Sequence, residues 1–254
     1  MKRAYTGYIR EAFTYSTYFF RPKRHPVKKF FIFSFGRSGS NLLVSFLNSH
    51  PQIQCDNELL WKRVLSPKRY LKCHERLSKK DIYGFKFLSS HFEVQNIRDP
   101  QIFVEDLHAS GYQIISLKRR NLIRQAISHL YAFYRGKFHH SEEQGEQTFV
   151  TMSLDPAKLE QELQWIDSLH QLEDSILANL PYLRLYYEDD LNDAINQQAA
   201  VDRITAFLGI PSARIGTNLK RTTPEDLSTI IENYDEVMTF VRGTKYYKEL
   251  LEIG

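Results

Sequence analysis

Apolar residues in this chain form short continuous runs, separated by longer stretches in which they recur every three or four positions. The run FFIFSF at 30–35 has the character of a parallel strand covered on both faces, and the apolar positions of 42–47 follow one helix face. Similar runs predict strands at 82–88, 112–119 and 182–189. Because strands and helices alternate, the fold class predicted is α/β, with a parallel β-sheet wound by right-handed crossovers.

The predicted helices carry start and stop signals. Asp99 and Pro100 begin a helix that ends at Gly111, and Thr223 with Pro224 begins another that extends to the apolar positions near 240. These signals place helices between and after the strands.

The chain has no internal repeat, low-complexity tract or linker, so a single domain is predicted over 28–254. Residues 1–27 form an N-terminal extension with the composition of an amphipathic helix. Two interpretations stay open for it: a helix packed on its own domain, or a peripheral contact with a membrane or a partner.

The charge balance is mildly basic, since 34 Lys and Arg against 30 Asp and Glu give a net charge of +4. This charge balance suits a small anionic ligand better than a nucleic acid, because proteins that bind nucleic acids usually carry a dense stripe of basic residues.

Cys55 and Cys73 cannot build a disulfide framework or a zinc knuckle, and no cluster has metal-ligand spacing, so no metal is predicted. No apolar run nears the ~20 residues of a membrane span, and the N-terminal segment, broken by Arg10 and Glu11, is unlike a signal peptide. A cytoplasmic protein is expected.

The first candidate site is the loop GRSGSN, which joins the strand at 30–35 to the next helix. A helix N-terminus offers unpaired N–H groups and a partial positive charge, and small residues allow an anion to approach closely. We therefore interpret the loop as a phosphate cradle, formed by Gly36, Arg37, Ser38, Gly39, Ser40 and Asn41. The alternative is an ordinary turn with Ser40 as the helix cap. The loop lacks the Lys of a Walker A motif, which disfavours a kinase or NTPase.

A second segment, SLKRRNLIRQAIS, repeats this arrangement at the strand 112–119. Arg120 follows that strand and Ser128 lies within the next helix, where both can converge on one phosphate. The alternative is a solvated basic helix start. Two anion sites on neighbouring strand ends favour a ligand with two separated phosphates, such as a bisphosphorylated nucleoside.

Together, FSFGRSGSNLL and LKRRNLIRQAIS resemble the two nucleotide-binding segments of sulfotransferases that use 3′-phosphoadenosine 5′-phosphosulfate (PAPS). The resemblance covers roughly 28–250, and the motifs NSHPQIQCDNELL, YAFYRGKFHH, LRLYYEDDLND and FLGIP favour the bacterial carbohydrate branch, similar to the trehalose and nodulation-factor enzymes. It implies a P-loop-like fold of the sulfotransferase type, with the first segment on the 5′-phosphosulfate. Arg120 and Ser128 would bind the 3′-phosphate, and Lys220 with Arg221 would close over it.

The resemblance also implies catalytic roles, with one departure. Many cytosolic members carry a catalytic His two residues after a strand Lys, but here Leu88 takes that position after Lys86. Glu58 matches a glutamate proposed as general base in the trehalose-type enzymes, and His91 and His50 are reserves. Arg37, assisted by Lys86, would stabilise the leaving phosphate. The alternatives are a solvated strand lysine for Lys86 and a first-turn helix glutamate for Glu58.

Two functions remain open from the sequence. The first is sulfuryl transfer from PAPS, with release of adenosine 3′,5′-bisphosphate (PAP), to a hydroxyl of a carbohydrate or glycolipid acceptor. The second is a non-catalytic nucleotide- or anion-binding protein of the same fold, which would not need Glu58 near the sulfuryl group. A homodimer is a further expectation, and sugar-stacking aromatic side chains are expected at Trp61, Tyr131, Tyr134 and Phe138.

Overall fold

The structure is a computed structural model that describes residues 2–20, 25–136, 149–219 and 223–248. The chain forms two compact units. The first consists of Met1–Lys118 and Leu172–Gly216, and the second of Arg119–Gln171 and Thr217–Gly254.

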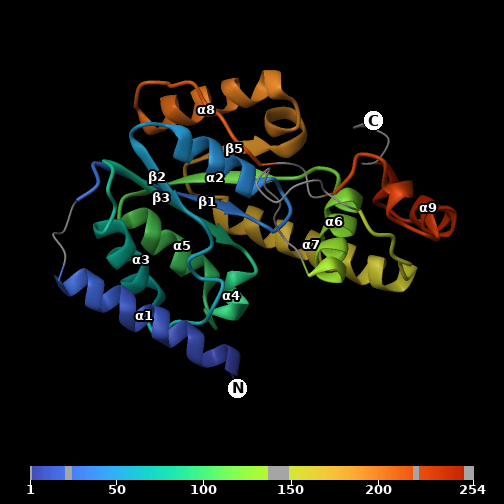
Figure 1. Ribbon diagram of the computed structural model, residues 1–254, viewed down its shortest axis with the longest axis horizontal. Coiled ribbons are helices and arrows are strands. Elements are labelled where there is room, and N and C mark those ends of the chain that lie inside the picture. Colours follow the sequence, from blue (N-terminus) through green and yellow to red (C-terminus); the bar gives the residue numbers. More distant parts are fainter. Residues whose placement is uncertain (1, 21–24, 137–148, 220–222, 249–254) are drawn as a thin grey trace. The chain divides into compact units, whose positions relative to one another are not determined.

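The first unit is built on one parallel sheet (Figure 1). Its strands are β1 (Lys28–Ser34), β2 (Ile53–Asp56), β3 (Ile82–Leu88), β4 (Tyr112–Lys118) and β5 (Tyr182–Tyr186), in the order β2-β3-β1-β4-β5. Every neighbouring pair is parallel, and the ends of β1 and β3 align because Ser34 pairs with Leu88. The carboxyl ends of the strands therefore share one edge, where ligands bind in such sheets. The predicted α/β class is confirmed.

Helices cover both faces of this sheet (Figure 1). One apolar cluster joins the sheet to α2 (Ser40–Ser49) and α8 (Ala194–Leu208). A second cluster, rich in stacked phenylalanines, joins the other face to α3 (Pro67–Arg76), α5 (Pro100–Ala109) and the last turn of α7 (Pro156–Leu177). Since both faces are covered, the central strands β1, β3 and β4 are buried along almost their whole length, which explains their continuous apolar runs.

The N-terminal extension contains helix α1 (Lys2–Phe20), which packs against α3. Glu11 anchors it: its carboxylate accepts hydrogen bonds from the backbone N–H groups of Leu65 at 2.7 Å and Ser66 at 3.2 Å. Glu11 is buried, so these bonds offset the desolvation of its charge. The sequence left two interpretations of this segment open: a helix packed on its own domain, or a contact with a membrane or partner. The inner face of α1 packs on its own unit, as the first interpretation states.

β2 was not predicted, and β5 is shorter than expected. β2 has four residues and alternates buried with half-buried positions, so it lacks a continuous apolar run. The strand predicted at 182–189 ends at Tyr186 because Asp190 accepts a hydrogen bond from the Tyr186 N–H at 2.7 Å. A π-helical turn at Tyr187–Leu191 follows.

The second unit contains α6 (Leu122–Arg135), most of α7 and α9 (Tyr234–Arg242). The helix predicted to start at Thr223 begins only at Tyr234, after a 3₁₀ turn at Leu227–Thr229. The physical reason is tertiary: Ile231 pairs with Met152 in an isolated parallel bridge. Both side chains are buried, so packing and extended pairing override the local start signal.

Candidate functional site

The cradle loop between β1 and α2 has the backbone of an anion-binding turn. Arg37 has φ 61° and Gly39 has φ 86°, so left-handed residues alternate with Ser38 between them, a pattern that turns backbone N–H groups toward one concavity. A Cβ on Gly39 would lie 2.4 Å from the Tyr187 ring, which requires glycine there. Gly39 is also the N-cap of α2, and no side-chain hydrogen bond caps that helix. The alternative in which Ser40 caps an ordinary helix is therefore wrong.

The two serines of the loop lie in different local environments. The Ser38 hydroxyl is buried and donates to the Phe35 carbonyl at 2.9 Å, which holds the turn closed. Ser40 is buried in the first turn of α2. Contact of Gly36 and of either serine with a ligand stays a prediction.

A charged cluster lies beside this loop, at the carboxyl ends of β2 and β3. The Lys86 ammonium lies 2.8 Å from Glu58 Oε1 and also donates to Asn41 Oδ1 of α2. His91 Nε2 lies 3.6 Å from Glu58 Oε2. The Lys86 side chain is 2% exposed and that of Glu58 29%. Glu58, Lys86 and Asn41 of the predicted site are thus together, and the alternative of a solvated Lys86 is wrong.

The tautomer of His91 follows from its backbone partner. The Leu88 N–H donates to His91 Nδ1 at 3.2 Å, so Nδ1 is unprotonated and Nε2 carries the proton, directed at Glu58. Burial lowers the pKa of His91, although the Glu58 carboxylate opposes this. At 3.6 Å from Glu58 Oε2, Nε2 is beyond hydrogen-bond distance. Because Nδ1 already accepts from the backbone, the neutral ring has no free acceptor, which makes Glu58 the stronger candidate for a proton acceptor.

Electrostatics in the cluster keep Glu58 ionised. Burial alone would raise the pKa of this carboxyl, but the His91 N–H and the Lys86 ammonium outweigh it and lower the pKa to about 2. Burial lowers the pKa of Lys86 against the opposing Glu58 charge, and the nearby Arg37 guanidinium lowers it further. Arg37 is therefore electrically coupled to the same cluster.

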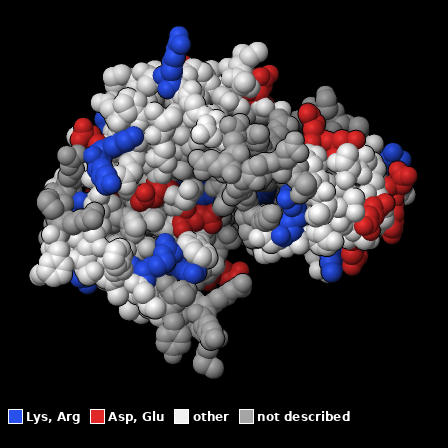
Figure 2. All heavy atoms as spheres, in the orientation of Figure 1, with Lys and Arg blue, Asp and Glu red and all other residues white. Residues whose placement is uncertain are grey.

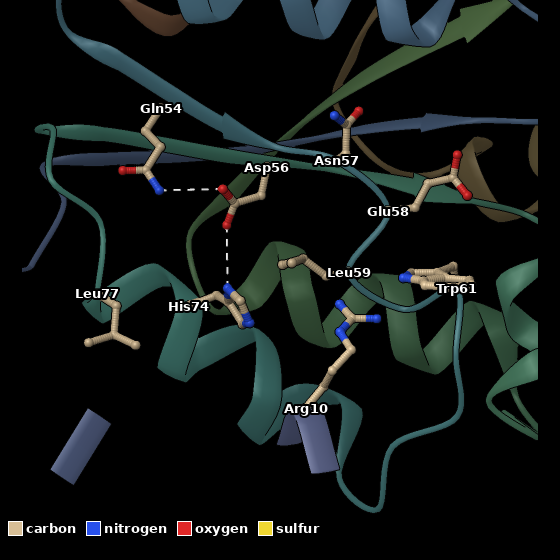
Figure 3. A pocket seen from close by; sticks show the side chains of 9 residues that line it. All are labelled: Arg10, Gln54, Asp56, Asn57, Glu58, Leu59, Trp61, His74 and Leu77. Atoms are coloured by element: carbon tan, nitrogen blue, oxygen red, sulfur yellow. Dashed lines mark hydrogen bonds and ion pairs between the residues drawn. The ribbon is translucent and has the colours of Figure 1, made fainter. Parts of the chain in front are cut away.

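Glu58 also lines a pocket of about 390 Å³ (Figure 3). Side chains from α1, β2, the segment after β2 and α3 surround it: Arg10, Gln54, Asp56, Asn57, Glu58, Leu59, Trp61, His74 and Leu77. Asp56 organises one wall, because it contacts the amide of Gln54 at 3.4 Å, His74 at 3.4 Å and the Tyr83 hydroxyl at 2.9 Å. Planar polar groups, two leucine side chains and an indole ring meet in a volume typical of small-ligand sites.

Sequence reasoning missed two features of this pocket. Asp56 ends β2, so it could have been found had that short strand been recognised, since ligands bind at strand ends. Arg10 could not have been found, because α1 is distant in sequence and reaches the pocket through tertiary packing. Of the expected aromatic side chains Trp61 lines the pocket, whereas the Tyr131 hydroxyl donates to the Val150 carbonyl at 3.0 Å and its ring is buried.

A buried carboxyl, Glu173 of α7, lies apart from the predicted site residues. It is fully buried, and neither carboxyl oxygen has a hydrogen-bond partner among the described residues. Burial raises its pKa to about 7, and the cations Lys118 and Arg184 oppose this rise.

This shift predicts a pH dependence of folding. Between the ordinary pKa of 4.5 and about 7, the unfolded chain has lost the Glu173 proton while the folded chain retains it. The free energy of unfolding therefore falls as pH rises through this window, by roughly 3 kcal/mol at most. We expect Glu173→Gln, which is neutral at every pH, to gain stability over the wild type as pH rises.

Urea unfolding across this pH range measures the difference in the free energy of unfolding. The control is Glu160→Gln, which changes an exposed glutamate of the same helix. If the free energy of unfolding of Glu173→Gln depends on pH in the same way as that of the wild type, the raised pKa is contradicted.

In the second unit, the predicted 3′-phosphate residues lie at the start and middle of α6. Arg120 is exposed, two residues after the end of β4. Ser128 is buried, and its hydroxyl lies 2.8 Å from the Thr223 hydroxyl. Lys220 and Arg221 lie outside the described residues, as does Phe138. The convergence of both segments on one nucleotide stays a prediction of the sequence.

Two further features are absent from the described part of the chain. No group of three or more His, Cys, Asp and Glu side chains there could hold a metal ion. None of its helices is long and apolar enough to cross a membrane.

His50, the second reserve for the base, contacts the Pro211 carbonyl through Nε2 at 3.0 Å and accepts from the Gln52 N–H at 3.1 Å, so both its nitrogens have backbone partners.

Comparison with known proteins gives similarity at the level of structure. No protein-family model matches the chain, and no curated protein matches its sequence. A sulfotransferase from Alicyclobacillus acidocaldarius is similar in structure, with 13% identity over 86% of this chain and 94% of that one, at a TM-score of 0.49. Mouse sulfotransferase SULT7A1, in complex with PAP, is 18% identical over 74% of this chain and 61% of that one, at a TM-score of 0.45. At these identities and scores, the function has to be inferred from the residues of this chain.

Proposed function

We propose that this protein is a PAPS-dependent sulfotransferase that acts on a hydroxyl of a carbohydrate or glycolipid acceptor. The observation that carries the proposal is the position of Glu58. Its carboxylate is paired with a buried lysine that also contacts the cradle loop, and it lines a separate 390 Å³ pocket. A group with one side toward an anion loop and another toward a polar pocket suits transfer from a phosphorylated donor to a hydroxyl.

The donor would bind with its 5′-phosphosulfate in the loop. The left-handed residues Arg37 and Gly39 and the uncapped start of α2 supply N–H groups and a partial positive charge. The Arg37 guanidinium adds a full charge. The resemblance in sequence supports the same assignment, with Arg120 and Ser128 on the 3′-phosphate.

The reaction is an in-line displacement at sulfur. The acceptor oxygen forms a bond to sulfur while the bond between sulfur and the bridging oxygen breaks, and the proton of the acceptor hydroxyl passes to Glu58. Negative charge builds on the leaving 5′-phosphate, where Arg37 and Lys86 would stabilise it. Water exclusion strengthens this effect, since Lys86 is buried.

Lys86 links the two halves of the site. In the structure its ammonium acts together with His91 to lower the pKa of Glu58 to about 2, which makes the carboxylate a weak base. When anionic donor oxygens compete for the ammonium, the pairing with Glu58 weakens and the pKa of the carboxyl rises. Donor binding would thus strengthen the base, because a proton acceptor works best with a pKa nearer the working pH.

The nucleotide specificity tests the donor assignment. Titration calorimetry should show that PAP binds without Mg²⁺ and that ATP binds much more weakly, because the loop lacks the Lys and hydroxyl of a Walker A motif. Equal affinity for ATP, or a strict requirement for Mg²⁺, would overturn the proposed donor.

A variant locates the second phosphate. Arg120→Ala should weaken PAP binding about tenfold or more, the equivalent of a lost charged hydrogen bond, while 5′-AMP affinity changes little. Arg135→Ala, in the last turn of α6, the helix that follows Arg120, is the control and should leave both affinities unchanged. If Arg120→Ala weakens both nucleotides alike, this segment does not bind the 3′-phosphate.

A further inference from the structure

The outer face of α1 is apolar and exposed. Ile9, Phe13 and Phe20 are 67%, 72% and 83% exposed. At about 100° per residue they fall within about 40° of one another around the helix. Exposed Ala12 and Ser16 lie between them, so no charged side chain interrupts this face from residue 8 to residue 20. A helix on the surface of a protein normally turns polar side chains toward water. We therefore expect this apolar face to contact another molecule.

The apolar face continues onto the segment between β2 and α3. Trp61 and Leu65 are 49% and 78% exposed. The Arg10 guanidinium lies 5.5 Å from the centre of the Trp61 ring, and Glu11 accepts the Leu65 N–H. The Arg10 contact places Trp61 beside the outer face of α1. The two together form one surface, which we call the α1 face and which consists of Ile9, Phe13, Phe20 and Trp61.

Cations border Trp61 on the α1 face, because the Arg10 guanidinium lies 5.5 Å and the Lys62 ammonium 4.2 Å from the centre of its ring. Residues 59–74 contain five Lys and Arg and no Asp or Glu, and Arg63, Arg69 and Lys72 are exposed. Asp106 pairs with Lys68 of this stretch. Figure 2 shows one group of Lys and Arg atoms on this side of the first unit, with Asp and Glu atoms close by. Aromatic and aliphatic side chains with a basic border are typical of surfaces that lie in the interface of an anionic membrane.

We propose that the α1 face docks on an anionic lipid membrane. A second copy of this chain fits less well, because a symmetric contact would bring the basic borders of the two copies together. A membrane requires no shape complementarity, and its anionic headgroups match Arg10 and Lys62, which contact Trp61, and the exposed Arg63 that follows them.

Docking in this way would place the pocket at the membrane surface. Arg10 and Trp61 belong both to the border of the α1 face and to the pocket lining (Figure 3). Where the proposed function holds, on which this step rests, the acceptor is a sugar headgroup carried by a lipid. The membrane contact itself requires neither donor nor acceptor, so its test can fail while sulfuryl transfer stands, and the reverse.

Sedimentation with vesicles tests the proposal. The wild type should bind vesicles of equal parts phosphatidylcholine and phosphatidylglycerol, and bind pure phosphatidylcholine more weakly. Phe13→Ser should reduce binding to the mixed vesicles about tenfold, and Arg63→Gln about fivefold, the latter with little change on neutral lipid. The matched control is Ile195→Ser, which removes an equally exposed apolar side chain, 83% exposed, from α8 and should bind like the wild type.

Fluorescence locates the contact. The chain has two tryptophans, so Trp165→Phe leaves Trp61 as the reporter, and its emission should shift to the blue and be quenched by brominated lipids. Three outcomes would overturn the proposal: no binding to anionic vesicles at low salt, equal loss in Phe13→Ser and Ile195→Ser, or an unquenched Trp61. A dimer that Phe13→Ser dissociates, seen by elution volume, would instead make the α1 face an interface between copies. Unchanged circular dichroism and PAP affinity confirm that the variants fold.

Discussion

Glu58→Gln is expected to lower turnover about 100-fold or more, because a positioned general base contributes on the order of 10²–10⁴ in rate. Glutamine keeps the shape of the side chain and removes the proton acceptor. The Glu58 carboxylate is ionised well below neutral pH, with a pKa of about 2, so the wild type has its base ready at any working pH. Steady-state kinetics with labelled PAPS and a screened acceptor measure the loss.

The same variant should bind PAP within about twofold of the wild type, the range usual for a change outside the contact. Glu93→Gln is a matched control, since Glu93 is an exposed glutamate two residues from His91. Near-normal turnover in Glu58→Gln would show that Glu58 is not the general base. Loss of PAP binding would show that Glu58 instead maintains the cradle loop through Lys86 and Asn41.

Lys86→Met is expected to lower turnover about 10²–10³-fold, the usual cost of removing one preorganised donor where charge develops. Methionine keeps the length and apolar stem of this buried side chain and removes its charge. The pH profile gives a second readout that a purely structural role would not move. Without the ammonium, which lies 2.8 Å from the carboxylate, the pKa of Glu58 rises from about 2.

The acid limb of kcat/KM in Lys86→Met should therefore move to higher pH. Activity requires the ionised carboxylate, so it falls as pH drops through the pKa of Glu58. In the wild type that limb lies near pH 2 or below, and in the variant it enters the measurable range. Lys29→Met, which removes another strand lysine paired with a carboxylate, Glu75 at 3.4 Å, is the control and should leave the limb in place. An unmoved limb in Lys86→Met would mean that Lys86 does not set the pKa of the base.

Local sequence patterns predicted the frame of the site. Four of the five strands and the loop after β1 follow from continuous apolar runs and from small residues next to a helix start. Such signals are local, because a strand covered on both faces has to be apolar along its length. The left-handed backbone at Gly39 is likewise anticipated by the glycine, the residue that tolerates such a conformation without strain.

Other elements depended on contacts distant in sequence. β2 is too short and too exposed on alternate residues to give a strand signal, yet it carries Asp56 into the pocket. The helix signal at Thr223 failed because Ile231 pairs with Met152. Glu173 is an ordinary polar position of a helix pattern, and its raised pKa comes from burial that the pattern does not reveal.

By itself, the sequence determined the α/β class, the glycine- and serine-rich loop after β1 and the identity of the chemical groups, since these follow from the residue types and their spacing along the chain. The tertiary structure decided which groups act together. It joins Asn41 of α2, Glu58 after β2 and Lys86 of β3 in one cluster, and it lays α1 beside the pocket. The physical reason is that pKa values, pockets and exposed faces arise from distances between elements, and packing of the whole sheet sets those distances.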